Sequence, residues 1–377
     1  TTFLKARNDE SFLVLLDIEL KEKMGIEELT KQLDAIKNMY GKIQSIDSEA
    51  TVGYIEAGNK VVEVPVLTDV GWMNVEYTIN ATSSIVDFKI MPSDKRDEDG
   101  YNETLYELTV EDMKTEMIVT RPTAFDENTP VLILIGGRHA YDWNSTIGVN
   151  KVFRDLSYLL ADEGVAVVRY DRLLDSEDVD DSLQLMTEEL NQIWEKLDSF
   201  DDLRTHPRYM LGYDQGGFFM PLLAQMFEAD GYIISSAMSG YLQDDLAEET
   251  LRNIESGNKS EQEKETARSQ VQAALDMIDS LEKEEDYAYN ILGYPTSFWL
   301  TMREYDSAER LETISGRVLI TQGSNDFEVD ETDYSRWKKA GKNLSNVTYK
   351  YYKNMNHIFA INKEPSTEED YLQTMKI

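Results

Sequence analysis

The feature that most constrains the fold is a short glycine-rich turn between an apolar run and a helix-like segment. Residues 208–213 read RYMLGY and residues 218–227 read FFMPLLAQMF. The turn between them places Asp214 and Gln215 among three glycines, Gly212, Gly216 and Gly217. Small residues on both sides let a strand and a helix approach closely while the central residue is held in a strained conformation. The stretch therefore predicts a sharp strand-to-helix turn with Asp214 at its tip.

The region from residue 104 onward alternates between strand and helix patterns. The continuous apolar run PVLILIGG at 130–137 is typical of a parallel strand that is buried on both faces. Residues 105–122 predict two leading strands. Later strand patterns lie at 165–171, 208–214, 231–240, 316–326 and 347–352, and helical patterns lie at 151–164 and 183–200. This rhythm predicts an α/β domain with a doubly wound, mostly parallel sheet over residues 104–377.

A highly charged helical segment at about 241–290 interrupts this rhythm. Because it lies between two strand patterns, we expect a helical cap over the strand ends, with a solvated helical hairpin as the alternative. Five aromatic residues flank or lie in the segment. They are candidates to line a pocket or, alternatively, to pack within the cap: Tyr241, Tyr287, Tyr289, Tyr294 and Trp299.

The first 91 residues have a different pattern. Residues 12–40 show apolar positions at helical spacing, and residues 51–92 then alternate with a period of two in four segments separated by turn residues. This predicts a small α+β module of helices followed by an antiparallel sheet over residues 1–91. The polar stretch 92–103 is expected to be a linker.

The composition excludes several classes of partner and site. The 377-residue chain has 72 Asp and Glu against 37 Lys and Arg, a formal net charge of −35. Such a field repels phosphate backbones and anionic lipids, so we expect no nucleic-acid partner. The apolar runs are too short for membrane insertion. The absence of cysteine excludes disulfides and thiolate chemistry. No spacing of His, Asp and Glu predicts a metal site, and we expect no cofactor.

The chain begins at Thr1. This start fits removal of a signal peptide or a shortened chain, and no targeting segment remains to choose between them. A secreted or cell-surface location is therefore one expectation. The oligomeric state stays open.

An acid and a base follow the turn in the order that a catalytic triad needs. Asp326 comes just after the strand pattern RVLITQGSN, and His357 lies in a loop after the strand pattern at 347–352. The chain has only 3 histidines. We expect His357 to be a base that Asp326 orients, with a packing histidine and a turn-capping aspartate as the alternatives.

Several stretches together resemble a bacterial esterase branch of the α/β-hydrolase superfamily, in which a small helix-plus-sheet module often precedes the hydrolase domain. They are GGRHAYDWNSTIGVNKVFRDLSYLLADEGVAVVRYDR, LGYDQGG, YPTSFWLTMREYD, RVLITQGSNDFEVD and YYKNMNHIFA. The resemblance implies Asp214 at the nucleophile position, Asp326 as the acid and His357 as the base. It further implies oxyanion donors at the backbone N–H of Gln215 and in the loop near Gly137 and Arg138. Beside the turn, Arg138, His139, Trp143 and Tyr213 are further candidates to contact the substrate, with a solvated loop arginine and packing aromatics as the alternatives.

The turn departs from the family pattern, which usually reads Gly-His-Ser-x-Gly-Gly, because Tyr213 and Asp214 replace the histidine and serine. A carboxylate suits displacement at saturated carbon, as in related dehalogenases and epoxide hydrolases. We therefore expect a hydrolase with an Asp-His-Asp triad that acts on a small ester-like, haloalkyl or epoxide substrate. Two alternatives stay open: a catalytically silent relative that binds a ligand, and an esterase variant whose serine was replaced.

Overall fold

The structure, a computed structural model, forms two compact units, Thr1–Glu98 and Asp99–Ile377. It describes residues 9–24, 27–28, 30–31, 33–34, 41–46, 52–56, 59–68, 71–92, 101–110, 113–137, 142–148, 150–173, 182–256, 260–282, 289–363, 366–367 and 371. The division falls between residues 98 and 99, and residues 101–103 begin the first strand of the larger unit.

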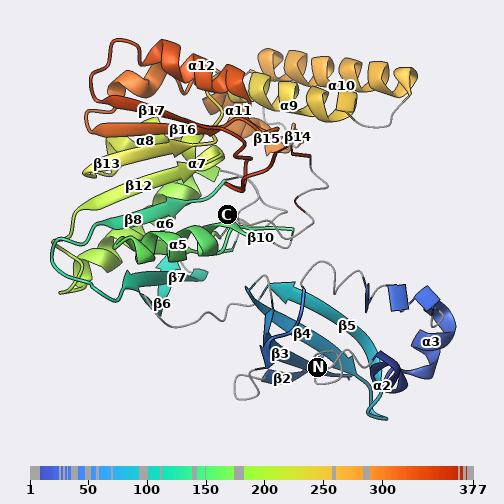
Figure 1. Cartoon of the computed structure of the whole chain (residues 1–377). Coiled ribbons are helices and arrows are strands. Elements are labelled where there is room, and N and C mark those ends of the chain that lie inside the picture. Colours follow the sequence, from blue (N-terminus) through green and yellow to red (C-terminus); the bar gives the residue numbers. More distant parts are fainter. Residues whose placement is uncertain are drawn as a thin grey trace. The chain divides into compact units, whose positions relative to one another are not determined.

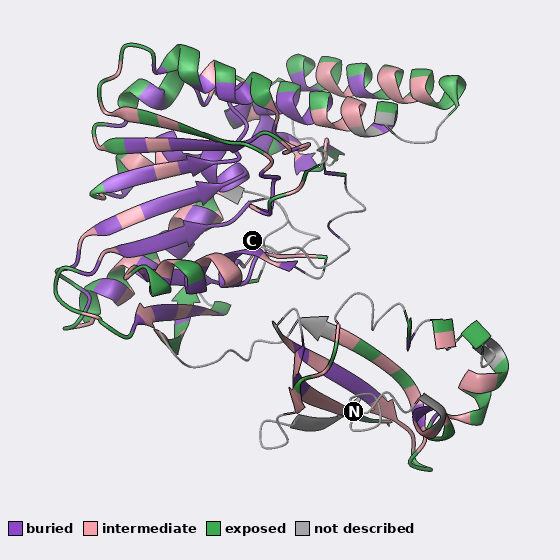
Figure 2. Ribbon diagram, in the orientation of Figure 1, coloured by how far each residue is buried: buried purple, intermediate pink, exposed green. Residues whose placement is uncertain are grey.

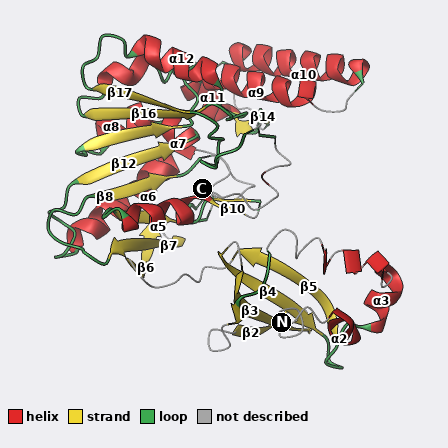
Figure 3. Ribbon diagram, in the orientation of Figure 1, coloured by secondary structure: helices red, strands yellow, loops and turns green. Residues whose placement is uncertain are grey.

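The smaller unit places helices against an antiparallel sheet, which confirms the predicted α+β module (Figure 3). Its helices are α2 (Asp9–Val14) and α3 (Ile18–Met24). Its strands are β1 (Ser45–Ile46), β2 (Val52–Glu56), β3 (Asn59–Thr68), β4 (Gly71–Ile79) and β5 (Ile85–Pro92). Phe12 and Leu16 from the helical segment pack against Val66 and Val75 of the sheet in one core.

The larger unit contains the predicted doubly wound sheet (Figure 1). The eight strands lie in the order β17-β16-β13-β12-β8-β11-β7-β6, and only the pairs β6–β7 and β7–β11 are antiparallel. Their bounds are β6 (Tyr101–Val110), β7 (Met113–Pro122), β8 (Val131–Ile135), β11 (Ala166–Tyr170), β12 (Arg208–Tyr213), β13 (Gly231–Ser235), β16 (Arg317–Gly323) and β17 (Val347–Tyr352).

Burial on both faces explains the continuous apolar sequence of β8, whose five residues are all buried (Figure 2). Ile133 packs in one core with helices α6 (Ser182–Ser199), α8 (Met220–Met226) and α12 (Glu331–Ala340). Leu132 and Leu134 pack in a second core with α5 (Val152–Asp162). Each such burial contributes roughly 1.5–3 kcal/mol relative to an exposed side chain. Helices therefore cover both faces of the sheet.

The charged insert forms a helical hairpin of α9 (Leu242–Ser256) and α10 (Glu261–Ser280), which lie side by side (Figure 1). A capping box between Ser260 and Glu263 starts α10. Leu242 and Ile278 anchor the hairpin in the main core. Short elements follow it: β14 (Asn290–Ile291), β15 (Tyr294–Pro295), α11 (Thr296–Met302) and the 3₁₀ helix η1 (Glu309–Thr313).

Two elements differ from the sequence prediction. The helix after the turn is divided into α7 (Gln215–Phe218) and α8, because Pro221 has no N–H for a bond in the preceding turn. The strand predicted at 231–240 ends at Ser235, since Ser236 has a positive φ of 47°. A further small hairpin of β9 (Thr146–Ile147) and β10 (Asn150–Lys151) lies before α5.

In the described part of the chain, no helix has the length and apolar character needed to cross a membrane.

Candidate active site

The turn after β12 holds Asp214 in the strained conformation that its glycines predict. Asp214 has φ 52° and ψ −118°, and its side chain is buried. A Cβ on Gly212 would lie 2.3 Å from the Gly216 carbonyl oxygen, and a Cβ on Gly216 would lie 2.5 Å from the Ile135 carbonyl oxygen. Only glycine fits such approaches, so the glycines let β12, α7 and β8 meet around Asp214.

Gly137, two residues after the end of β8, lies directly against the Asp214 carboxylate. A Cβ on Gly137 would be 2.3 Å from Oδ2 of Asp214. The Gly137 carbonyl accepts a hydrogen bond from Nη1 of Arg172 at 3.4 Å. Arg172 is buried and forms an ion pair with buried Glu189, with Nε 3.6 Å from Oε2. Arg172 could not be identified from the sequence alone, because only the sheet topology brings the ends of β11 and β8 together.

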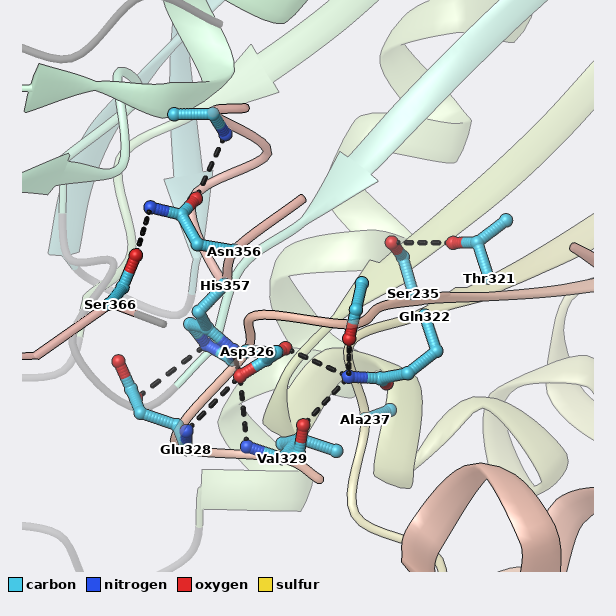
Figure 4. Close-up of polar contacts among 12 residues, drawn as sticks. Ser235, Ala237, Thr321, Gln322, Asp326, Glu328, Val329, Asn356, His357 and Ser366 are labelled. Atoms are coloured by element: carbon cyan, nitrogen blue, oxygen red, sulfur yellow. Dashed lines mark hydrogen bonds and ion pairs between the residues drawn. The ribbon is translucent and has the colours of Figure 1, made fainter. Parts of the chain in front are cut away.

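Asp326 lies in the loop after β16 and accepts a hydrogen bond from Nδ1 of His357, with Oδ2 at 3.0 Å (Figure 4). The carboxylate also accepts from the Gln322 amide at 3.1 Å and from the backbone N–H of Val329 at 3.0 Å. These donors stabilise its negative charge and fix its orientation. The structure thus brings together Asp326 and His357, the two residues that the sequence singled out.

The loop after β17 holds His357 by backbone and side-chain bonds around Asn356. The buried Asn356 side chain accepts from the Ala360 N–H at 2.9 Å and donates to Ser366 at 3.1 Å (Figure 4). The ring of Tyr213 packs against the imidazole, with centroids 4.8 Å apart. Tyr213 is itself buried among Phe153 and Phe359, so the structure gives it a packing position.

A third carboxylate, which the sequence pattern did not predict, faces the other nitrogen of His357. Oε2 of Glu328 lies 3.6 Å from Nε2. Burial alone lowers the pKa of His357, but the carboxylates of Asp326, Glu328 and Asp214 outweigh burial and raise the pKa to about 10. In the sequence, Glu328 could have been noticed only because it lies two residues after Asp326. The conformation of the loop is what turns the Glu328 side chain toward the imidazole ring.

The region after the hairpin also reaches the turn. Oη of Tyr294, in β15, accepts a hydrogen bond from Nε2 of Gln215 at 2.8 Å. Trp299 is fully buried and donates its indole N–H to the Ile291 carbonyl at 2.8 Å. Tyr241 and Tyr289 are exposed. Of the predicted cap aromatics within the described residues, Tyr294 is therefore bonded to the turn.

Of the remaining residues that the sequence singled out, the structure describes some and not others. Trp143 is partly buried, and its backbone N–H donates to Asp171 at 2.6 Å, beside the end of β11. Arg138, His139 and Tyr287 lie outside the described residues. Among the described side chains, no group of three or more His, Asp and Glu is arranged to hold a metal ion.

The sheet order, the strained turn after β12 and the loops after β16 and β17 define the α/β-hydrolase fold. No model of a known protein family matches the chain. Along its sequence the chain is similar to Esterase EstD of Thermotoga maritima, at 22% identity over an alignment of 383 positions that spans 98% of this chain and 89% of the relative. The fold and this full-length similarity together support a hydrolase enzyme.

Two of the solved structures that are similar to this chain illustrate the extent of the similarity. Est1E from Butyrivibrio proteoclasticus has a TM-score of 0.45 and 16% identity, covering 69% of this chain and 91% of its own. Proline iminopeptidase of Mycobacterium smegmatis has a TM-score of 0.45 and 16% identity, covering 68% of this chain and 92% of its own. The fold assignment rests on the strand order and turn geometry of the chain itself.

Proposed function

We propose that this chain is a hydrolase of small organic molecules in which Asp214 is the nucleophile and His357, oriented by Asp326, is the base. The observation that carries the proposal is the position of Asp214 at the strained tip of the turn after β12. The full-length similarity to Esterase EstD supports hydrolysis as the reaction class.

An aspartate at this position favours displacement at saturated carbon. Attack on an ester carbonyl would give a mixed anhydride, which is a high-energy intermediate. Attack on a carbon that bears a halogen or an epoxide oxygen gives an ordinary alkyl ester of Asp214, and the halide or alkoxide leaves with the bonding electron pair. We therefore propose haloalkyl or epoxide substrates ahead of ester-like ones.

Hydrolysis of the alkyl-enzyme is the step that uses His357. Its Nε2 takes a proton from water, and the hydroxide attacks Cγ of the Asp214 ester. The Gln215 N–H and the chain near Gly137 are proposed to stabilise the oxyanion. The alcohol then leaves with the proton from His357, and the Asp214 carboxylic acid releases its own proton to solvent, which restores the carboxylate and the neutral imidazole. The proposed helical cap, α9 and α10, would enclose the substrate.

This mechanism predicts that turnover rises toward alkaline pH. The base must be neutral, and carboxylates hold the pKa of His357 at about 10 despite burial. The first step needs no base, so the alkyl-enzyme accumulates near pH 7. Steady-state rates and intact mass measured from pH 6 to pH 10 check both expectations. A rate that peaks near pH 7 without an adduct contradicts them.

A panel of haloalkanes, haloacids, epoxides and p-nitrophenyl esters tests the reaction class. We expect turnover of a haloalkyl or epoxide substrate and an alkyl adduct on Asp214. Asp214→Asn is the matched control, because it keeps the size of the side chain and removes the nucleophilic charge. No adduct and no turnover on the panel would defeat the proposal.

The similarity to Esterase EstD favours a second candidate, an esterase-type chain in which Asp214 replaces the nucleophilic serine. Asp214→Ser distinguishes it, because this variant would then hydrolyse p-nitrophenyl esters that the unaltered chain leaves intact. A silent ligand-binding relative is the remaining alternative. It would bind a small ligand without turnover in either form.

A further inference from the structure

The Glu328 carboxylate lies beside Nε2 of His357, the nitrogen that takes a proton from water in the proposed mechanism. Its Oε2 lies 3.6 Å from Nε2, while Asp326 accepts from Nδ1 at 3.0 Å on the other side. The Glu328 side chain is only 14% exposed, and that of His357 only 2%. Both ring nitrogens therefore face carboxylates in a region with little solvent (Figure 4).

The backbone of Glu328 is fixed from two sides. Its N–H donates to Oδ1 of Asp326 at 3.1 Å, and its carbonyl accepts from Nη2 of Arg252 at 2.7 Å. Arg252 belongs to α9 and also donates to Asp330 at 3.2 Å. The acid loop and the helical hairpin thus hold Glu328 beside the imidazole.

The titratable side chains that raise the pKa of His357, or pack against its ring, are three acids and a phenol. Asp326 and Glu328 come from the loop after β16, Asp214 comes from the turn after β12, and Tyr213 comes from β12 itself. Burial opposes a charge on the ring, but these carboxylates outweigh it and raise the pKa. An imidazolium in this site has a partner for each of its N–H groups.

We infer that Glu328 is a positioning residue that pairs with Nε2 of His357, keeps the ring protonated and withholds it from water until the proton is lost. The inference rests on the proposed function, because only there does the ring act as a base. Alkylation of Asp214 proceeds with the pair intact, whereas hydrolysis waits for its separation. Glu328 therefore sets the pH at which turnover begins.

Histidine NMR titration without substrate tests this role directly. The chain has 3 histidines, so His139→Gln and His206→Gln assign the His357 signal. In the unaltered chain we expect His357 to stay protonated at pH 8. In Glu328→Gln it should titrate about 1 to 3 pH units lower. Glu331→Gln, an exposed glutamate three residues away, is the matched control and should change nothing.

Two results would overturn the inference: a neutral His357 at pH 8 in the unaltered chain, or the same titration in Glu328→Gln as in the control. The first reading stands even if Glu328→Gln does not fold. With a substrate, the pH at which turnover begins should fall in Glu328→Gln by the same interval as the titration. A chain that titrates as expected yet hydrolyses nothing would defeat the proposed function and leave the Glu328–His357 pair established.

Discussion

At the scale of single residues, the site is built on close approaches that leave no room for larger side chains. Asp214 has φ 52° and ψ −118°, a conformation that residues with a Cβ rarely adopt. Its carboxylate lies against Gly137, whose missing side chain makes that approach possible. The tip of the turn therefore stores strain at the position where we propose the nucleophile.

The strain can be measured by comparing two variants that both lack the carboxylate. Asp214→Gly should be more stable than Asp214→Ala by about 1–3 kcal/mol, because glycine adopts a positive φ without steric cost. Urea denaturation of the pair gives this difference in the free energy of unfolding. Equal stabilities would mean that the turn is not strained.

The contact between Gly137 and Asp214 gives a second residue-scale prediction. Gly137→Ala would bring a Cβ to 2.3 Å from Oδ2, so we expect a loss of about 1–3 kcal/mol in stability and a loss of adduct formation. In an Asp214→Gly background, most of the stability loss should disappear. Additive losses in the double variant would contradict a direct contact.

At the scale of elements, buried acids join the helical hairpin to the core. Asp333 in α12 accepts from Ser239 at 2.8 Å, and Asp245 in α9 accepts from the Gly240 N–H at 2.9 Å. Arg336 lies between them, with Nη1 2.7 Å from Asp245. Burial, and then the charge of Asp245, raise the pKa of Asp333 to about 7. Burial raises the pKa of Asp245 to about 6.

These raised pKa values predict a loss of stability with rising pH. The folded chain keeps protons on Asp333 and Asp245 that the unfolded chain releases near pH 4, so stability falls between about pH 4 and pH 7. Asp333→Asn should remove part of this slope and raise stability at pH 8 by on the order of 1 kcal/mol. Denaturation at pH 5 and pH 8 checks it. An unchanged slope would contradict the prediction.

Tyr294 gives a second element-scale prediction, because it links β15 to the turn. Tyr294→Phe leaves the buried Gln215 amide without the acceptor that lies 2.8 Å away, at a cost of about 1–3 kcal/mol. Tyr241→Phe is the matched control at an exposed tyrosine and should cost nothing measurable. Thermal unfolding of the two variants gives the comparison. Equal melting temperatures would show that the bond contributes no stability.

At the scale of the whole molecule, the net charge of −35 should make stability depend on salt. Self-repulsion among 72 acidic side chains favours the expanded chain, and added salt screens it. The screening length falls from about 10 Å at 0.1 M to about 3 Å at 1 M salt. We expect the melting temperature in sodium chloride to rise by at least about 2 °C over this range. A fall would show that favourable ion pairs dominate.

Much of the fold could be predicted because it depends on local patterns. The five apolar residues of β8 and the glycines around Asp214 report burial and close approach directly in the sequence. The strand β1 was not predicted, because two residues are too few to show a periodic pattern. The break before Pro221 was not predicted either, because it interrupts the apolar pattern for only one residue.

The site was predicted only in part, for a different reason. Asp326 and His357 stand out by their order in the chain, and the structure brings them together. Glu328 and Arg172 act through neighbours far away in sequence or through a loop conformation, and acidic or basic residues are too common in this chain for their positions to be informative. Their roles depend on tertiary structure.

A single turnover in ¹⁸O-labelled water tests the central claim, that Asp214 attacks carbon, most directly. If the alkyl-enzyme forms and water attacks Cγ, the first product molecule takes its oxygen from Asp214, and the label enters the Asp214 carboxylate. Mass spectrometry of the peptide that contains Asp214 should therefore show a gain of ¹⁸O after reaction with a haloalkyl or epoxide substrate that the enzyme hydrolyses. Label that appears in the first product and never in Asp214 would contradict the account.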